Sequence, residues 1–163
     1  MNCSTVRLCG NALASMSMEM RDDTELVRAA VTQNGGALVF ASRRLKDDRS
    51  IVLAAVKQNP ELSFRHASIR LRDDLLVVLT AVKRCGKLII YASRRLRHNI
   101  LIAMFAVRQD GNFLAWLPQE VQARRSVVLA AIRQNPDALM YAAPHLRQSC
   151  ASLLSGNTVN LKG

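Results

Sequence analysis

The chain has 163 residues, of which 50% are hydrophobic and only 4% are aromatic. That length suits one domain with a continuous core, and the abundance of Ala, Leu and Val favours packed helices over a β-sandwich. The formal net charge of +11 is compatible with a nucleic acid, an anionic membrane or an acidic protein as partner, and it does not choose among them.

The N-terminal residues MNCSTVRLCGNALASM contain no apolar run long enough for a signal peptide. The most hydrophobic stretches, 75–82 and 100–107, are far shorter than the roughly 20 residues of a membrane span. The four cysteines are Cys3, Cys9, Cys85 and Cys150. They form no CxxC pair, so we expect reduced thiols, no metal site and no cofactor in a protein of the cytoplasm or nucleus.

From residue 22 onward the chain repeats itself with a period of about 25 residues. The motif ASRRLKDD at 41–48 returns as ASIRLRDD at 67–74 and as ASRRLR at 92–97. The second repeat is one residue longer, with the insertion near Phe64–His66. We therefore expect residues 1–163 to form a single helical-repeat domain, with a half repeat, five full repeats and a tail at 6–21, 22–46, 47–72, 73–97, 98–122, 123–147 and 148–163.

Each repeat is predicted to contain two short helices. In the first helix the apolar positions follow the spacing i, i+1, i+4 and i+5, which gives one buried stripe. The Asp pair lies where N-caps belong, and Asp22 with Glu25 resembles a capping box. Gly35, Pro60, Gly86, Gly111 and Pro136 share the position that ends this helix, where we expect glycine to supply a left-handed C-cap.

The second helix is predicted to place Leu38, Ala41 and Leu45 on one face. Helices this short are marginal alone, so stacking on neighbouring repeats must stabilise them. An alanine recurs at one position of the first helix, which favours close helix–helix packing. We predict an all-α fold, an α-solenoid or stack of about five to six helical hairpins, in which the apolar first helices of the third and fourth repeats are the most buried.

The recurring pattern D-x-x-x-V-x-x-A-V-x-x-[NC]-[GP]-x-x-L-x-[FY]-A-S-x-x-L-[KR]-D resembles the repeat of the domain of unknown function 4116 family. The resemblance covers roughly residues 6–147. It weakens in the fourth repeat, where WLPQEV replaces YASRRL, and in the fifth, where Ala123-Arg124 replaces the Asp pair. It implies an all-helical repeat fold and carries no catalytic residues.

Two sets of basic residues are candidate binding sites. The basic residues of RRLK and its copies precede the Asp pairs, and their charges suit the ends of two successive helices, so we interpret them mainly as a structural seam. The other set, the basic row, lies at the end of the first helices and faces outward, with Thr32 at this position in the first repeat. The basic row consists of Lys57, Lys83, Arg108 and Arg133.

Secondary candidates lie elsewhere in the repeat. Phe40, Tyr91, Trp116 and Tyr141 share one position of the second helix, where a ring either fills the gap between repeats or stacks on a base. Arg44 and Arg95 follow four residues after such rings, within stacking reach. Arg124 and Arg125 add charge where the Asp pair is missing.

No cluster of residues in the sequence indicates a reaction, so we expect no enzyme. The predicted function is a non-enzymatic scaffold that binds another protein through one face of the helical stack. The alternative is a nucleic acid or other phosphate-rich ligand bound along the basic row. Because the chain starts and stops within repeats, we also expect self-association through its two ends.

Overall fold

The computed structural model describes the backbone of residues 10–156 and the side chains of residues 12–151. Every regular element within that range is a helix, which confirms the predicted all-α repeat fold. The chain divides into two compact units, residues 1–93 and 94–163. Cys3, Cys9, the start of the half repeat and the last seven residues of the tail lie outside the described range.

Helices of the 3-10 type are labelled η. The first unit contains η1 (Gly10–Ser15), α2 (Met18–Arg21), α3 (Thr24–Gln33), η2 (Gly35–Phe40), α4 (Arg43–Lys46), α5 (Arg49–Gln58), α6 (Pro60–Ser63), η3 (Phe64–His66), η4 (Leu71–Asp73), α7 (Leu75–Arg84) and η5 (Gly86–Tyr91). The second unit contains α8 (Arg94–Arg97), α9 (Ile100–Gln109), η6 (Gly111–Trp116), α10 (Gln119–Gln122), α11 (Arg125–Gln134), η7 (Pro136–Tyr141) and α12 (Pro144–Gly156).

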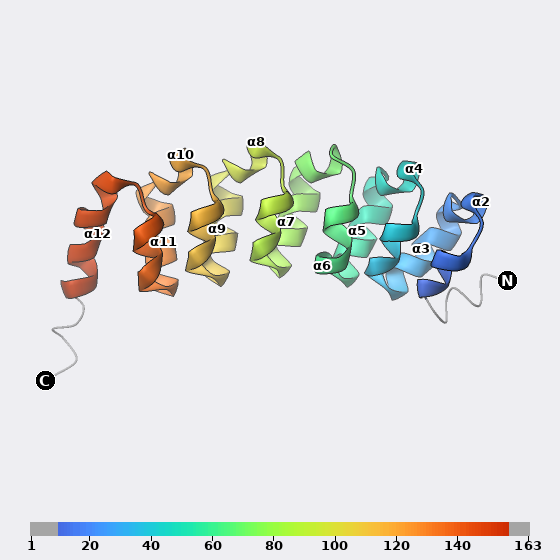
Figure 1. Ribbon diagram of the computed structural model, residues 1–163, viewed down its shortest axis with the longest axis horizontal. Coiled ribbons are helices and arrows are strands. Elements are labelled where there is room, and N and C mark those ends of the chain that lie inside the picture. The colour runs from blue at the N-terminus through green and yellow to red at the C-terminus, as the bar shows by residue number, and fades with distance from the viewer. Residues whose placement is uncertain (1–9, 157–163) are drawn as a thin grey trace, which may run out of the picture. The chain divides into compact units, whose positions relative to one another are not determined.

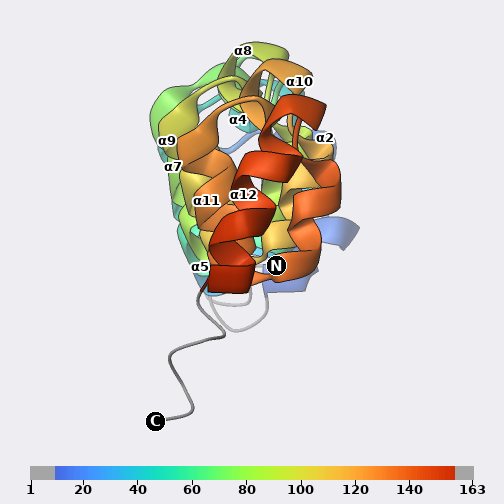
Figure 2. The ribbon, with the colours of Figure 1, turned by 90° about the vertical axis from the view of Figure 1, so that its left-hand side faces the viewer.

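The first helices of the five repeats are α3, α5, α7, α9 and α11, each of ten residues. Within each unit they stand side by side on one face, the far side in Figure 1, and the 3-10 helices stand on the other. Figure 2 shows this division for the second unit, with the short α10 at the upper edge. Short α-turns such as α10 therefore connect the two faces along one edge of the repeats.

The predicted stripe of the first helix is confirmed: α3 buries Leu26, Val27, Ala30 and Val31, and the other four helices bury the equivalent positions. The recurring alanine is fully buried in every repeat. The capping box is wrong in register, because Asp23 caps α3, with its side chain accepting a hydrogen bond from the Leu26 amide at 2.8 Å.

The predicted second helix is wrong in detail, since it is broken into two pieces. A 3-10 helix such as η2 ends at Phe40, and the next two residues, Ala41 and Ser42, are both extended. The Ser42 hydroxyl then accepts a hydrogen bond from the Leu45 amide and caps the short α4. The serine thus starts a new helix where the pattern suggested the middle of one, and Leu38, Ala41 and Leu45 are still all buried.

The predicted left-handed glycine caps are also wrong, because no described glycine has a positive φ. Glycine is needed for space instead. A Cβ on Gly35 would overlap the Ala55 carbonyl oxygen of the next repeat, and one on Gly111 would lie 2.5 Å from the Ala131 oxygen. The glycine of one repeat therefore packs directly against the backbone of the recurring alanine in the next repeat.

The insertion in the second repeat is absorbed by a change of helix type. Residues 60–66 form one α-helical turn followed by a short 3-10 helix, where other repeats use six residues of 3-10 helix. Phe64 is completely buried, and His66 is the residue that precedes the extended alanine, as Phe40 does in the first repeat. Phe64 therefore belongs to the core and not to the aromatic position.

Candidate functional site

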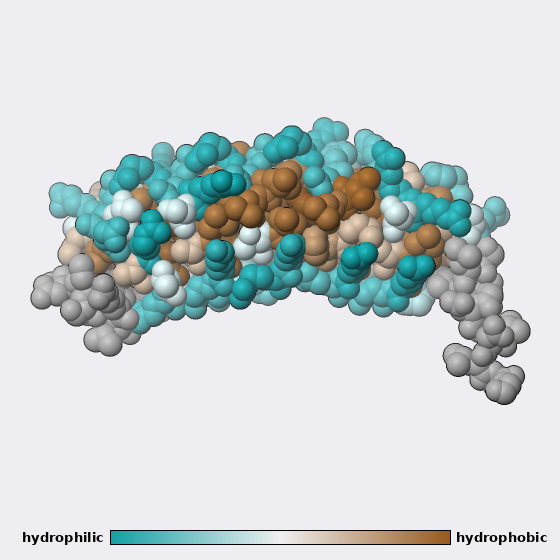
Figure 3. Space-filling model, turned by 180° about the vertical axis from the view of Figure 1, so that it is seen from behind, coloured by the Kyte–Doolittle hydropathy of each residue, from teal (hydrophilic) through white to brown (hydrophobic). Residues whose placement is uncertain are grey.

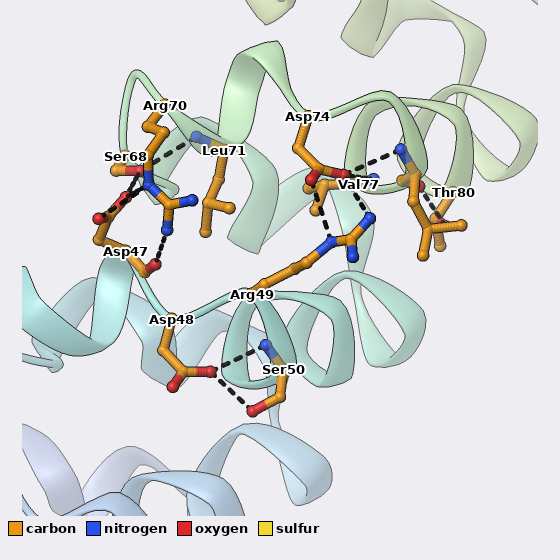
Figure 4. A network of polar contacts seen from close by, with 11 residues as sticks. Asp47, Asp48, Arg49, Ser50, Ser68, Arg70, Leu71, Asp74, Val77 and Thr80 are labelled. Carbon is orange, nitrogen blue, oxygen red and sulfur yellow. Dashed lines mark hydrogen bonds and ion pairs between the residues drawn. The ribbon is translucent and has the colours of Figure 1, made fainter.

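A polar joint links successive copies of the RRLK–DD motif, such as those at 41–48 and 67–74 (Figure 4). Asp47, the first aspartate of its pair, accepts hydrogen bonds from the Ser68 hydroxyl and from Arg70 Nε, 3.0 Å from both carboxylate oxygens. Arg70 Nη2 also donates to the Asp47 carbonyl oxygen at 2.5 Å. The Ser68 amide donates to the Lys46 carbonyl oxygen at 2.9 Å, so the joint includes a backbone hydrogen bond as well.

The same joint recurs one repeat earlier, where Asp22 accepts from Ser42 and from Arg44 Nε at 3.0 Å. One repeat later, the Ser93 hydroxyl donates to Asp73. The seam interpretation is therefore right in kind for Arg44 and Arg70. It is wrong about the partners, because each arginine binds the aspartate that begins its own repeat, more than 20 residues earlier in the chain, and not the charges beside it.

These contacts change the acidity of the carboxyl groups. The hydrogen bond from Ser68, and then that from Arg70, holds the pKa of Asp47 below its ordinary value of 3.8. Ser42 and Arg44 lower the pKa of Asp22 in the same way. Both aspartates are therefore charged at neutral pH, and the stability that they contribute is lost as the pH falls through the lowered pKa.

A second joint lies at the other end of the first helices. Gln58 accepts a hydrogen bond from the Gly35 amide at 2.5 Å and donates to the Gln33 carbonyl oxygen at 3.0 Å. In the second unit Gln134 accepts from the Gly111 amide at 2.5 Å. Each of these repeats is thus linked to its predecessor through polar side chains at the end of its first helix.

The basic row lies next to this second joint. Lys57, Lys83, Arg108 and Arg133 are all exposed in the last turn of their helices, as expected from the helical wheel. The sequences of α5, α7, α9 and α11 contain no acidic residue. The face on which these helices lie therefore carries positive charge along one edge in each unit.

Open grooves run between successive first helices. The groove between α3 and α5 is lined by Thr32, Ser50, Leu53, Ala54, Lys57 and Gln58. The groove between α9 and α11 is lined by Met104, Arg108, Ser126, Ala130, Arg133 and Gln134. In both, apolar side chains such as Leu53 and Met104 share the wall with a serine and a glutamine, and members of the basic row lie at one end.

Two first helices expose large apolar side chains on this face. Leu75 and Leu76 of α7 are each 47% exposed, and Ile100 and Leu101 of α9 are 40% and 54% exposed. Figure 3, which looks onto the first helices, shows brown surface over α7 and, in the second unit, over α9. The expectation that these two helices are the most buried is therefore wrong, because their additional apolar residues face solvent.

The shared aromatic position is neither fully buried nor fully open. Tyr91 and Trp116 are 36% and 46% exposed, whereas Phe40 and Tyr141 are half-buried. Trp116 stacks on Phe113 of its own repeat, with ring centroids 4.9 Å apart. Arg44 donates to Asp22, so its guanidinium is engaged in the joint.

Arg124 and Arg125 are both exposed at the start of α11. Arg124 occupies the N-cap position and makes no capping hydrogen bond, whereas Asp23, Asp48, Asp74 and Asn99 cap the other first helices through their side chains. A cation at a helix N-terminus is opposed by the helix dipole, so the local structure does not account for Arg124.

Among the described side chains, His, Cys, Asp and Glu do not gather in any group of three suited to a metal ion. None of the helices in the described range combines the length and the apolarity that crossing a bilayer would need. Cys85 is half-buried and donates to Glu61 at 3.4 Å, and burial raises the pKa of its thiol. Cys150 is buried.

These features define an all-α protein built from a 25-residue repeat, with polar joints at both ends of its first helices. The chain belongs to the family described as Domain of unknown function (DUF4116), whose model matches residues 4–44, 23–72, 74–122 and 102–147. No curated protein and no solved structure matches the chain.

Proposed function

We propose that the protein is a non-enzymatic, intracellular scaffold that binds another protein through the face carrying its first helices. The exposed aliphatic residues of α7 and α9 are the observation that supports this most strongly. Exposed apolar patches bordered by polar residues mark interaction sites, because burying them against a partner removes apolar surface from water.

The other polar groups of the repeat have structural uses that compete with a catalytic role. Ser68 and Arg70 both donate to Asp47 across a joint, and Asp48 and Asp74 cap helices. Apart from Arg49, Gln58 and Gln134, which bond neighbouring repeats, most side chains of the first-helix face are left as surface that the joints do not use. Binding therefore fits this face better than the edge that carries the RRLK motifs.

A photo-reactive amino acid placed at Leu76 tests the scaffold proposal in cells that make the full chain. We expect adducts that a protease removes and a nuclease does not. Met18, which is 85% exposed on α2, is the matched control position. Equal yields at both positions, or adducts sensitive to nuclease, would overturn the proposal.

A second candidate function is the binding of a nucleic acid or other phosphate-rich ligand along the basic row. The exposed cations of α5, α7, α9 and α11, on helices without acidic residues, favour it. Aliphatic side chains argue against it, because bases are held by stacking on aromatic rings and by hydrogen bonds.

A mobility shift with mixed RNA and duplex DNA at two salt concentrations separates the two functions. Phosphate binding weakens steeply with salt because counterions are released. Binding at low salt that is lost when Lys83 and Arg108 are both changed to Glu would support the second candidate. Absence of any shift at low salt would eliminate it.

A further inference from the structure

The outward-facing residues in the first turn of the first helices are polar in some repeats and apolar in others. At the two outer positions of the first turn, α5 has Arg49-Ser50 and α11 has Arg125-Ser126. At the same positions α7 has Leu75-Leu76 and α9 has Ile100-Leu101. All four helices bury the same inner stripe, so the apolar pairs are not required by the fold.

The apolar surface continues along each helix toward its basic residue. On α7 the half-buried Leu79 follows Leu76 by three residues, and Lys83 follows one turn later. On α9 the half-buried Met104 follows Leu101, and it lines the groove with Arg108. Each helix thus presents an aliphatic strip that ends at a cation, and no acidic side chain interrupts it.

We propose that this face of each unit docks an amphipathic helix of a partner protein, whose aliphatic stripe is flanked by Asp or Glu. The inference rests on the proposed scaffold function and adds the chemistry of the partner. Aliphatic side chains of the partner enter the grooves and cover the exposed Leu and Ile, as in helix-in-groove recognition. Its carboxylates meet the basic row, which fixes the orientation of the bound helix.

Two other possible occupants of this face, a second copy of the chain and an anionic lipid surface, fit it less well. A second copy of the chain would bring cations against cations on this face, in a protein of net charge +11. An anionic lipid surface needs apolar side chains that project into it, whereas Leu79 and Met104 are half-buried and the groove walls lie between helices. An acidic amphipathic helix would fill the grooves with its aliphatic side chains and complement the basic row with its carboxylates.

The chain supplies its own test variants. Leu75→Arg with Leu76→Ser gives α7 the outer face of α5, and Ile100→Arg with Leu101→Ser does the same for α9. Lys83→Thr and Arg108→Thr place on α7 and α9 the residue found at this position in α3. Each change copies a residue that a neighbouring repeat accommodates, so all variants are expected to keep wild-type helical content.

The probe is a displayed library of amphipathic helices of about 18 residues, long enough to be helical on binding, with Glu, Gln or Lys at the flanking positions. We expect selection on the wild-type protein to enrich Glu flanks. Replacing both apolar pairs should weaken the selected peptides about tenfold or more, as for hot-spot residues. Replacing both cations should weaken them about threefold and remove the preference for Glu.

Ile69→Ser is the control, because Ile69 is 80% exposed and lies outside the first helices. It should leave peptide binding unchanged. Enrichment of Lys flanks, or equal loss with the control, would overturn the inference. So would binding to vesicles rich in anionic lipid, or to single-stranded RNA, that depends on the same apolar pairs.

The two proposals fail in different ways. If the photo-reactive group at Leu76 captures protein and the library shows no preference for Glu, the acidic partner is wrong and the scaffold stands. If that group captures nothing beyond the Met18 control, the scaffold function itself is wrong.

Discussion

Arg70 follows Asp47 by 23 residues in the chain, yet it binds this residue at two points. Its Nε is 3.0 Å from both carboxylate oxygens, and its Nη2 is 2.5 Å from the backbone carbonyl oxygen. One guanidinium therefore secures both the side chain and the main chain at the C-terminal end of α4. In the copy at 41–48 this role is specialised to Arg44, whose Nε and Nη2 bind the Asp22 carboxylate and carbonyl oxygen at 3.0 and 2.5 Å.

Arg44 and Arg43 provide a direct test of that specialisation. Arg44→Gln should lower the thermal unfolding midpoint because Asp22 loses a charged partner, although the effect is small for an exposed pair. Arg43→Gln, at an exposed neighbouring position, should have less effect. The difference measured by circular dichroism should shrink at high salt. Equal shifts for both variants would show that Arg44 contributes only net charge.

The joints predict a dependence of stability on acid. The pKa values of Asp22 and Asp47 are lowered in the folded protein, below the ordinary value of 3.8. The free energy of unfolding should therefore decrease as the pH falls from about the ordinary value to below the lowered pKa values. Urea unfolding at a series of pH values measures this slope. In the Asp47→Asn variant the slope should be shallower, and an unchanged slope would assign it to other carboxyl groups.

Gly35→Ala should destabilise the first unit. The added Cβ would overlap the Ala55 carbonyl oxygen, which is backbone and cannot move independently of α5, so a cost of about 1–3 kcal/mol is expected. Gly36→Ala is the matched control, because its Cβ would meet only the side chains of Asn34 and Leu62, at 3.2 and 3.3 Å. Urea unfolding should show a change within about 0.5 kcal/mol for the control.

Phe64 and Phe40 test the change of register in the second repeat. Phe64→Ala should cost about 3–5 kcal/mol, because the side chain is completely buried. Phe40→Ala should cost clearly less, since Phe40 is only half-buried. Comparable losses in denaturant unfolding would mean that both rings occupy the same aromatic position after all.

Arg124→Asp should stabilise the protein. The change places an N-cap at the one first helix among α3, α5, α7, α9 and α11 whose N-cap makes no side-chain hydrogen bond, for a gain of about 1 kcal/mol. Arg125→Asp removes the same charge one residue later and should gain less. If Arg124→Asp gains no more than Arg125→Asp in thermal unfolding, removal of repulsion and not capping explains the result.

Periodicity alone predicted the inner stripe of the first helices, since the spacing of Leu26, Val27, Ala30 and Val31 permits only one buried face. It did not predict the break at Ser42, because the surrounding Ala, Arg and Leu are good helix formers. Pro118 and Pro144 were the overlooked signal. They lie in the middle of the predicted second helices of the fourth and fifth repeats, where proline is excluded from a continuous helix.

The apolar surface of α7 and α9 was missed for a different reason. A helix that is apolar on all sides is normally buried, and periodicity does not show which of its faces lacks a neighbour. Comparison of Leu75-Leu76 with Arg49-Ser50 would have found it, because equivalent positions in stacked repeats have equivalent exposure. The position of the basic row was predictable by the same reasoning.

The polar joints have a consequence for how such a chain changes length during evolution. Asp47 and Arg70, like Gly35 and Gln58, are separated by about one repeat length, so any segment of that length contains one copy of each partner of both joints. Tandem duplication of a repeat within a gene would copy both halves of every joint at once. The new copy would fit between its neighbours without any compensating substitution, and surface residues such as Leu75 and Leu76 could then change without disturbing the joints.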